Sequence, residues 1–234
     1  MKLKTIAISL TSIIALSILI MITVIWYIAT PTKGNKIADY TNPCKALMII
    51  DVQEDYTGKT AKPPFPYKES QEVISTINQM ILQAKDNGIK VIYVKQEFGS
   101  LLGKSISTIF SKGTAIKGNP GTEIDSRISL ISPAHIFEKS IGDAFSNQKL
   151  NKFLVDNSIN ELYLVGLDAE YCVHKTAQGA INRGYKVIMV TDALLLLAQN
   201  KWDRLLKLYS KEGFELTKSS EFLSRLNNLE SSNN

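Results

Sequence analysis

Residues 162–180 read LYLVGLDAEYCVHKTAQGA, and they join two different hydrophobic patterns. The apolar run 162–165 is typical of a buried strand, and apolar residues from Val173 onward recur at helical spacing. Cys172 is therefore expected at the turn between a strand and a helix. Free amides and the positive end of the helix dipole favour a thiolate at such a position. By position alone, the thiol is either a nucleophile or a small residue that packs the start of the helix.

Further apolar runs on both sides of this stretch predict strands that alternate with helices. Because such strands form a parallel sheet covered on both faces, we expect an α/β fold, a Rossmann-like three-layer sandwich with a mostly parallel central sheet. Residues 99–132 show no sustained period and predict a long loop, either lid-like or a mobile surface insertion. The expected strands are 46–50, 89–94, 134–138, 162–165, 186–190 and 214–216, and the expected helices include 70–87, 202–209 and a terminal helix at 222–226.

The N-terminal segment differs from the rest of the chain. No charged residue lies between Lys4 and Lys33, and residues 5–30 are dense in Ile, Leu, Val and Met. About 20 such residues, at roughly 1.5 Å each, cross the hydrocarbon core of a bilayer. We predict that residues 1–32 are an uncleaved single-pass anchor. A signal peptide is the alternative, but its apolar core would be shorter, and the small-x-small site near Ala29 is poor. Lys2 and Lys4 on one side and Lys33 and Lys36 on the other leave the positive-inside rule nearly tied, and the short basic leader favours a catalytic domain outside the cytoplasm.

The remaining length accommodates one domain of ordinary size, which we place at 45–230 after a linker at 33–44. The net charge is +5, but Lys and Arg are spread along the chain, so no nucleic-acid partner is expected. The two cysteines fit no metal-type spacing and there are only two histidines, so we predict no metal and no other cofactor. Cys44 and Cys172 could form a disulfide, although a domain of this size does not need one.

Three reactive side chains are expected at one edge of the sheet. Ligands bind at the carboxyl ends of parallel strands. Asp51 ends the first predicted strand, Lys139 ends a middle strand, and Cys172 follows another. Cys172 would attack, Asp51 would take and return a proton, and Lys139 would stabilise the thiolate and orient Asp51. Taken singly, each could be an ordinary capping, solvated or packing residue, but together they indicate a nucleophilic site.

These residues carry a resemblance to the isochorismatase-like cysteine hydrolase family. The similar segments are ALMIIDVQEDY at 46–56, EKS at 138–140 and GLDAEYCVHKTAQGA at 166–180. Their order and spacing cover the chain from about residue 45 to 226. The resemblance implies the triad Asp51, Lys139 and Cys172 on the isochorismatase-like fold, and hydrolysis of a small non-peptide amide through a thioester.

The resemblance also implies the surroundings of the thiol. A cis peptide bond before Asp168 would aim the backbone amides of Asp168 and Cys172 at a developing oxyanion. Substrate-binding roles fall on Gln53 and on Tyr56, which could stack on a planar substrate, and less directly on Tyr171. Ala169 stands where many relatives have threonine.

Departures from the family pattern narrow the activity. Nicotinamidases carry an Asp-and-His metal cluster where this chain reads KQEF at 95–98, which disfavours a metal and nicotinamide as the substrate. Cys172 disfavours the reaction of isochorismatases, which lack this cysteine. The alternatives are a catalytically silent binding module, an isochorismatase-type hydrolase of another small metabolite, and a redox domain without a nearby second cysteine. The expected partners are a small amide, the membrane through residues 5–30, and a second copy of the chain in a homo-oligomer.

Overall fold

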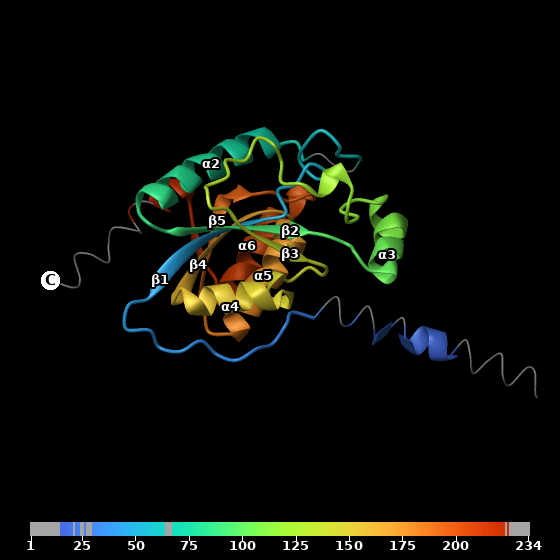
Figure 1. Ribbon diagram of the computed structural model, residues 1–234, viewed down its shortest axis with the longest axis horizontal. Helices are drawn as coiled ribbons and strands as arrows, with labels where there is room; N and C mark the ends of the chain where they lie inside the picture. Colours follow the sequence, from blue (N-terminus) through green and yellow to red (C-terminus); the bar gives the residue numbers. More distant parts are fainter. Residues whose placement is uncertain are drawn as a thin grey trace, which may run out of the picture. The chain divides into compact units, whose positions relative to one another are not determined.

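The computed structural model describes residues 15–20, 22–23, 26, 30–63, 67–222 and 224 (Figure 1). The chain divides into two compact units, residues 1–31 and 32–234. Most of the predicted anchor at 5–30, and most of the predicted helix at 222–226, lie outside the described residues. Within the described part, no helix has the length and apolar character needed to cross a bilayer.

The second unit is built on a six-stranded sheet in the order β3-β2-β1-β4-β5-β6. Every neighbouring pair is parallel, which confirms the predicted α/β architecture. The strand order changes direction between β1 and β4, and such a switch point opens a crevice at the carboxyl ends of these two strands. The strands are β1 Cys44–Ile50, β2 Lys90–Gln96, β3 His135–Lys139, β4 Ile159–Gly166, β5 Lys186–Leu194 and β6 Glu215–Thr217.

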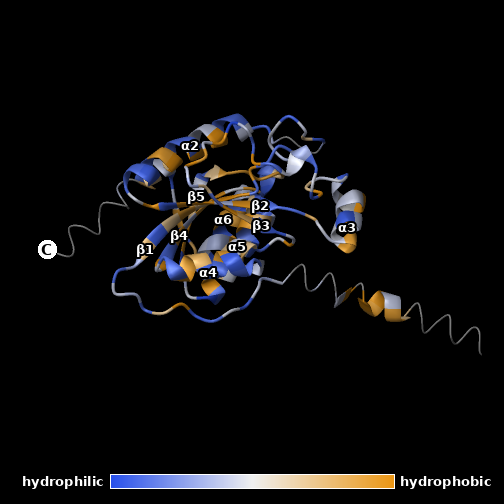
Figure 2. Ribbon diagram, viewed as in Figure 1, coloured by the Kyte–Doolittle hydropathy of each residue, from blue (hydrophilic) through white to orange (hydrophobic). Residues whose placement is uncertain are grey.

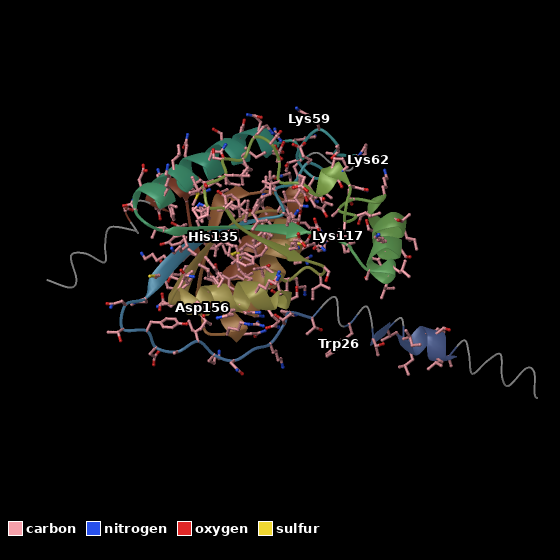
Figure 3. The ribbon with its side chains drawn as sticks, in the orientation of Figure 1. Trp26, Lys59, Lys62, Lys117, His135 and Asp156 are labelled. Carbon is pink, nitrogen blue, oxygen red and sulfur yellow. The ribbon has the colours of Figure 1, made fainter. Side chains whose placement is uncertain are left out.

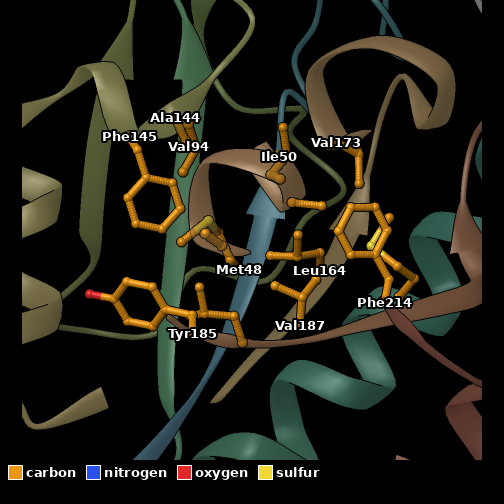
Figure 4. Close-up of a cluster of buried hydrophobic side chains, with 14 of the residues drawn as sticks. Met48, Ile50, Val94, Ala144, Phe145, Leu164, Val173, Tyr185, Val187 and Phe214 are labelled. Atoms are coloured by element: carbon orange, nitrogen blue, oxygen red, sulfur yellow. The ribbon is translucent and has the colours of Figure 1, made fainter. Parts of the chain in front are cut away.

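Helices cover both faces of the sheet and create two cores (Figure 1). Helix α2, Ser70–Asp86, packs on one face. The opposite face is covered by α4, Gln148–Asp156, α5, His174–Asn182, and α6, Trp202–Lys211. Figure 4 shows part of this second core, and the strands carry the hydrophobic colour in Figure 2. Strands buried on both faces explain why the sequence shows continuous apolar runs without alternation.

The prediction of a structureless segment at 99–132 is wrong, because it contains α3, Leu101–Ser111. The Ser100 hydroxyl accepts a hydrogen bond from the Gly103 amide at 3.0 Å and begins this helix. Leu101 and Ile109 are 87% and 73% exposed. Leu102, Ile106 and Ile109 do recur at helical spacing, but the repeat covers only about two turns among Gly, Ser and Lys residues, which the sequence analysis interpreted as a loop.

The predicted linker at 33–44 lies against the domain, and Thr32, the residue before it, is hydrogen-bonded there. The amide and hydroxyl of Thr32 donate to one carboxylate oxygen of Asp143, at 2.8 and 2.6 Å. Arg183 donates to the Thr32 carbonyl at 3.2 Å, and Ile37 packs against the core. The segment therefore lies along the domain rather than free in solvent.

Candidate active site

The carboxyl ends of β1 and β4 approach each other closely. Gly166 ends β4 with φ +106°, and a Cβ atom there would lie 2.1 Å from the carbonyl oxygen of Ile50. Asp51, the next residue after β1, has φ +56°, a region that residues other than glycine seldom adopt. Its amide donates to the Val94 carbonyl at 2.8 Å, which holds this backbone against β2. Residues in such conformations concentrate at functional sites.

The structure brings Asp51, Lys139 and Cys172 together. The ammonium of Lys139 lies 2.8 Å from Oδ2 of Asp51 and 2.7 Å from Oε1 of Gln96. The side chains of Lys139 and Asp51 are 0% and 3% exposed. The thiol of Cys172 interacts with both, and it lies in the helical turn 169–173 that precedes α5. The thiol, carboxylate and ammonium thus form one buried polar cluster, which we call the inner cluster together with Gln96.

Burial controls the protonation of the inner cluster. It raises the pKa of Cys172 to about 12; the Asp51 charge acts in the same direction, and Lys139 opposes it. Burial also raises the pKa of Asp51, against the opposing charge of Lys139. The pKa of Lys139 is raised because Asp51 and Cys172 outweigh the burial that would lower it. Burial therefore favours the protonated thiol of Cys172, which lies beside the paired side chains of Asp51 and Lys139.

The loop before Cys172 is fixed by hydrogen bonds around Asp168. The Leu167–Asp168 peptide bond is cis, as the resemblance implied. Oδ1 of Asp168 accepts from the Glu170 amide at 2.7 Å, and Oδ2 accepts from the Leu197 amide at 2.8 Å. The Ala169 amide donates to the Leu195 carbonyl, and the amides of Tyr171 and Val173 donate to the Asp168 carbonyl. The amides of 169, 170, 171 and 173 are therefore occupied.

The three predicted substrate-binding side chains lie in different surroundings. Gln53 is fully buried, and its side chain bonds to the backbone of Gln96 and Thr122, so it holds neighbouring strands together. Tyr56 interacts with Asp51 and Cys172, and burial together with these groups raises its pKa well above the usual range. Tyr171 is 58% exposed and lies beside Lys201. Of the three, Tyr56 has the placement best suited to contact a substrate.

Two residues of the site were missed by the sequence analysis. Gln96 of β2 pairs in register with Lys139 of β3. A prediction of the strand order, with β2 beside β3, would have placed Gln96 next to Lys139. Tyr67 follows a proline-rich loop and donates from its hydroxyl to Asp168 at 3.1 Å. Burial, Asp168 and Cys172 raise its pKa above the ordinary value. Nothing in the local sequence separates Tyr67 from an ordinary loop aromatic.

A second polar cluster occupies the same strand ends. Lys95 lies 3.0 Å from Glu97, and Lys117 lies 3.2 Å from both Glu97 and Glu138. Lys117, labelled in Figure 3, is 58% exposed in its side chain. We call these residues the outer cluster, with Glu123 as its most exposed member. Among the residues that the structure describes, no group of three or more His, Cys, Asp or Glu side chains could hold a metal ion.

The parallel α/β sheet gathers a thiol, a carboxylate and an ammonium at its carboxyl edge, a set of groups typical of α/β enzymes that use a nucleophile. The isochorismatase domain model matches residues 45–221, and the chain belongs to the isochorismatase family. It is accordingly an isochorismatase-family hydrolase.

Known relatives support this assignment. The chain is 26% identical over 150 residues to the isochorismatase family protein YddQ of Bacillus subtilis (strain 168), covering 63% of this chain and 76% of that protein. It is 26% identical over 180 residues to the nicotinamidase of Escherichia coli (strain K12), covering 64% and 82%. The structure of an isochorismatase family protein from Desulfovibrio vulgaris shares the fold, with a TM-score of 0.69, 21% identity and coverage of 79% and 99%.

Proposed function

We propose that this protein hydrolyses a small non-peptide amide through a thioester on Cys172. The observation that carries the proposal is the inner cluster, in which a buried thiol interacts with both members of the Asp51–Lys139 ion pair. A thiol needs an adjacent base to become a nucleophile, and the base needs a charge to hold it in place. The name of the nicotinamidase relative describes an amidase, which favours an amide over other acyl compounds as the substrate.

The reaction proceeds in two halves. Asp51 takes the thiol proton while the sulfur of Cys172 bonds to the amide carbon. The C–N bond then breaks, and Asp51 passes the proton to the leaving nitrogen, which departs as ammonia or an amine. Asp51 next takes a proton from water, whose oxygen bonds to the thioester carbon. The C–S bond breaks, the proton returns to the thiolate, and the carboxylic acid leaves.

We assign the oxyanion to the backbone amides of Asp168 and Cys172. The neighbouring amides of residues 169, 170, 171 and 173 already donate to acceptors within the protein. Two fixed donors in a site sheltered from water stabilise a tetrahedral intermediate without rearrangement. Tyr56 and Tyr67 lie close to the thiol and favour a planar acyl group.

Ammonia release from a panel of small amides tests the proposal, with intact-mass detection of a trapped acyl-enzyme. We expect Cys172→Ala to abolish both signals. Cys44→Ala is the matched control, because Cys44 is a free, exposed thiol far from the reaction in sequence, and its loss should leave both signals intact. Equal ammonia release by the parent and Cys172→Ala would refute the mechanism. Binding without turnover by the parent would favour a silent binding module.

Residues 5–30 carry a second proposal, which rests on the sequence alone. We propose that they anchor the protein in a membrane with the hydrolase domain outside the cytoplasm, because the segment has no charge and the basic residues Lys2 and Lys4 precede it. Protease added to intact cells should remove a C-terminal tag. Full protection of the tag, with degradation after lysis, would contradict this orientation.

A further inference from the structure

Helix α3 presents apolar side chains to solvent. Leu102, Ile106 and Ile109 recur at helical spacing and form an apolar stripe, in which Leu102 and Ile109 are 56% and 73% exposed. Leu101, at the start of the helix, is 87% exposed. The helix lies apart from α2, α4, α5 and α6, which cover the sheet (Figure 1). Exposed apolar side chains gathered on one element mark a surface that binds a partner.

The side of α3 that faces the domain is small and polar. A Cβ atom on Gly103 would lie 3.3 Å from the Phe98 side chain, so the glycine allows a close approach. One turn later, the buried Ser107 hydroxyl donates to the Thr114 carbonyl. Residues four apart share a face of a helix, so Gly103 and Ser107 face the domain together. An ordinary surface helix buries its apolar stripe, whereas α3 leaves most of its stripe in solvent.

The segment around α3 is basic. Between Glu97 and Glu123 the sequence holds Lys104, Lys112 and Lys117, and no Asp or Glu. Lys117 is paired with carboxylates of the outer cluster. Lys104 and Lys112 are therefore the basic residues next to the apolar stripe, and we call the stripe with these two lysines the α3 surface. Lysines beside an exposed apolar stripe are typical of helices that lie in the interface of a bilayer.

A second basic loop lies beside this segment. The Thr60 hydroxyl and the Ala115 amide both donate to the Asp55 carboxylate, each at 2.8 Å. Lys59 precedes Thr60 and Lys62 follows it, and both lysines are exposed (Figure 3). Because Ala115 follows α3 closely in the chain, the lysines of the two loops occupy neighbouring surface. Such a concentration of positive charge favours an anionic partner.

Thr32 is fixed at the same edge of the sheet as α3. It donates to Asp143, which lies four residues after the end of β3, and α3 begins five residues after the end of β2. Since β2 and β3 are parallel neighbours, both positions belong to the carboxyl edge of the sheet. The apolar segment 5–30 ends two residues before Thr32, and two residues span at most about 7 Å. A bilayer that received this segment would therefore lie within reach of the edge.

We propose that α3 is an interfacial element, whose apolar stripe enters the headgroup region of an anionic bilayer while Lys104 and Lys112 pair with lipid phosphates. The helix has 11 residues, too few to cross the hydrocarbon core, so it lies in the plane of the membrane. A second copy of the chain is the alternative occupant, but a two-fold contact would bring the same lysines face to face. The inference goes beyond the proposed hydrolysis and does not depend on it.

The test measures how deeply two positions enter vesicles that carry the full chain. A fluorophore is attached to Ile109→Cys or to Leu82→Cys, each with Cys44→Ala and Cys172→Ala. Leu82 is the matched position, because it is 52% exposed and lies near the end of α2 that leads to the start of β2, at the opposite edge of the sheet.

The vesicles contain phosphatidylcholine with or without phosphatidylglycerol, together with a nitroxide-labelled lipid that quenches fluorophores in the bilayer. In the vesicles with phosphatidylglycerol, we expect quenching at position 109 to exceed quenching at position 82 about 3-fold or more.

Variants separate the apolar and the charged contributions to the quenching at position 109. Leu102→Asp should lower it to the level at position 82, whereas Leu82→Asp, at a site of similar exposure, should leave it unchanged. Lys104→Gln combined with Lys112→Gln should lower it in vesicles with phosphatidylglycerol and not in phosphatidylcholine alone. The lysine variant keeps the test decisive if Leu102→Asp fails to fold.

Each other outcome contradicts the proposal. Equal quenching at positions 109 and 82 in the anionic vesicles overturns it, whatever the enzyme hydrolyses. Quenching that is the same in both kinds of vesicle overturns the role of anionic lipid. Excimer emission from a pyrene at position 109, without quenching by lipid, assigns the α3 surface to a second copy. No retention of the full chain on either kind of vesicle overturns this inference together with the proposed anchor, and leaves the proposed hydrolysis untouched.

Discussion

The inner and outer clusters lie one residue apart on the same two strands. Gln96 pairs with Lys139, and Lys95 pairs with Glu138. Successive side chains of a strand point to opposite faces, so one pair enters the core under α5 and the other faces the opposite side. The Lys139 side chain is 0% exposed, whereas that of Glu138 is 48% exposed. Both clusters contain ion pairs of similar length.

The difference is that the inner cluster is buried throughout, whereas the outer cluster reaches solvent through Lys117, Glu123 and Glu138. In the outer cluster, Lys95 and Glu97 are buried, but the other members, Lys117, Glu138 and Glu123, are exposed, and water screens their charges. In the inner cluster, one carboxylate faces one ammonium, and the third polar partner of Lys139 is a neutral amide. Removal of one charge there leaves its partner buried and uncompensated. The following predictions test this contrast.

The largest effect is expected for Lys139→Met. It leaves Asp51 buried without a counter-charge, so we expect a loss of about 3–5 kcal/mol in the free energy of unfolding, together with loss of ammonia release. Urea unfolding measures the free energy of unfolding, and the amide panel measures ammonia release. The double variant Asp51→Asn/Lys139→Met should recover stability but not activity. If the double variant is less stable than Lys139→Met, the ion-pair explanation fails.

A smaller loss in the free energy of unfolding is expected for Gln53→Met. This change removes the side-chain hydrogen bonds that clamp the end of β2, the strand that both clusters share. The amide and carbonyl of Gln96 and the Thr122 carbonyl lose their bonds to Gln53. Buried groups left unpaired cost about 1–3 kcal/mol each, and we expect a total of about 2–4 kcal/mol after relaxation. Urea unfolding again provides the measurement, and Gln71→Met on the surface of α2 is the control. A change equal to that of the control would contradict the clamp.

The pKa of the Cys172 thiol should depend on the charges of the inner cluster and not on those of the outer cluster. Burial raises the pKa of Cys172 to about 12, and Lys139 opposes this shift. Alkylation of Cys172 by iodoacetamide should therefore be slow at neutral pH and accelerate as the pH approaches 12. Lys139→Met should move the profile to higher pH, while Glu138→Gln should leave it unchanged. Mass spectrometry of the peptide that contains Cys172 follows the reaction. A profile with a midpoint near neutral pH would contradict the assigned resting state.

The smallest effect is expected for Glu138→Gln. Its carboxylate is half exposed and its partner Lys117 is more exposed still, so we expect a loss below about 1 kcal/mol that shrinks as salt is added. Urea unfolding at low and high ionic strength measures it. A loss as large as that of Lys139→Met would show that exposure does not separate the two clusters.

The sequence predicted the elements that depend on local pattern. Each expected strand is present, with ends shifted by a few residues, and α2 was expected at nearly its observed range. Helix α3 was missed because its helical repeat, Leu102, Ile106 and Ile109, is short and lies among Gly, Ser and Lys residues that are typical of loops. Asp51, Lys139 and Cys172 could be singled out because each follows a strand, and parallel strands bring their carboxyl ends to one edge.

The sequence by itself therefore determined the parallel α/β class and the three reactive candidates, since both follow from short-range periodicity and from where the strands end. Only the tertiary structure decided the rest. The pairing of β2 with β3 places Gln96 beside Lys139, and the loop after β1 brings Gln53 against the end of β2. Burial of the Cys172 thiol raises its pKa. These are contacts between residues distant in sequence, and local residue preferences carry no information about which distant groups exclude water from one another.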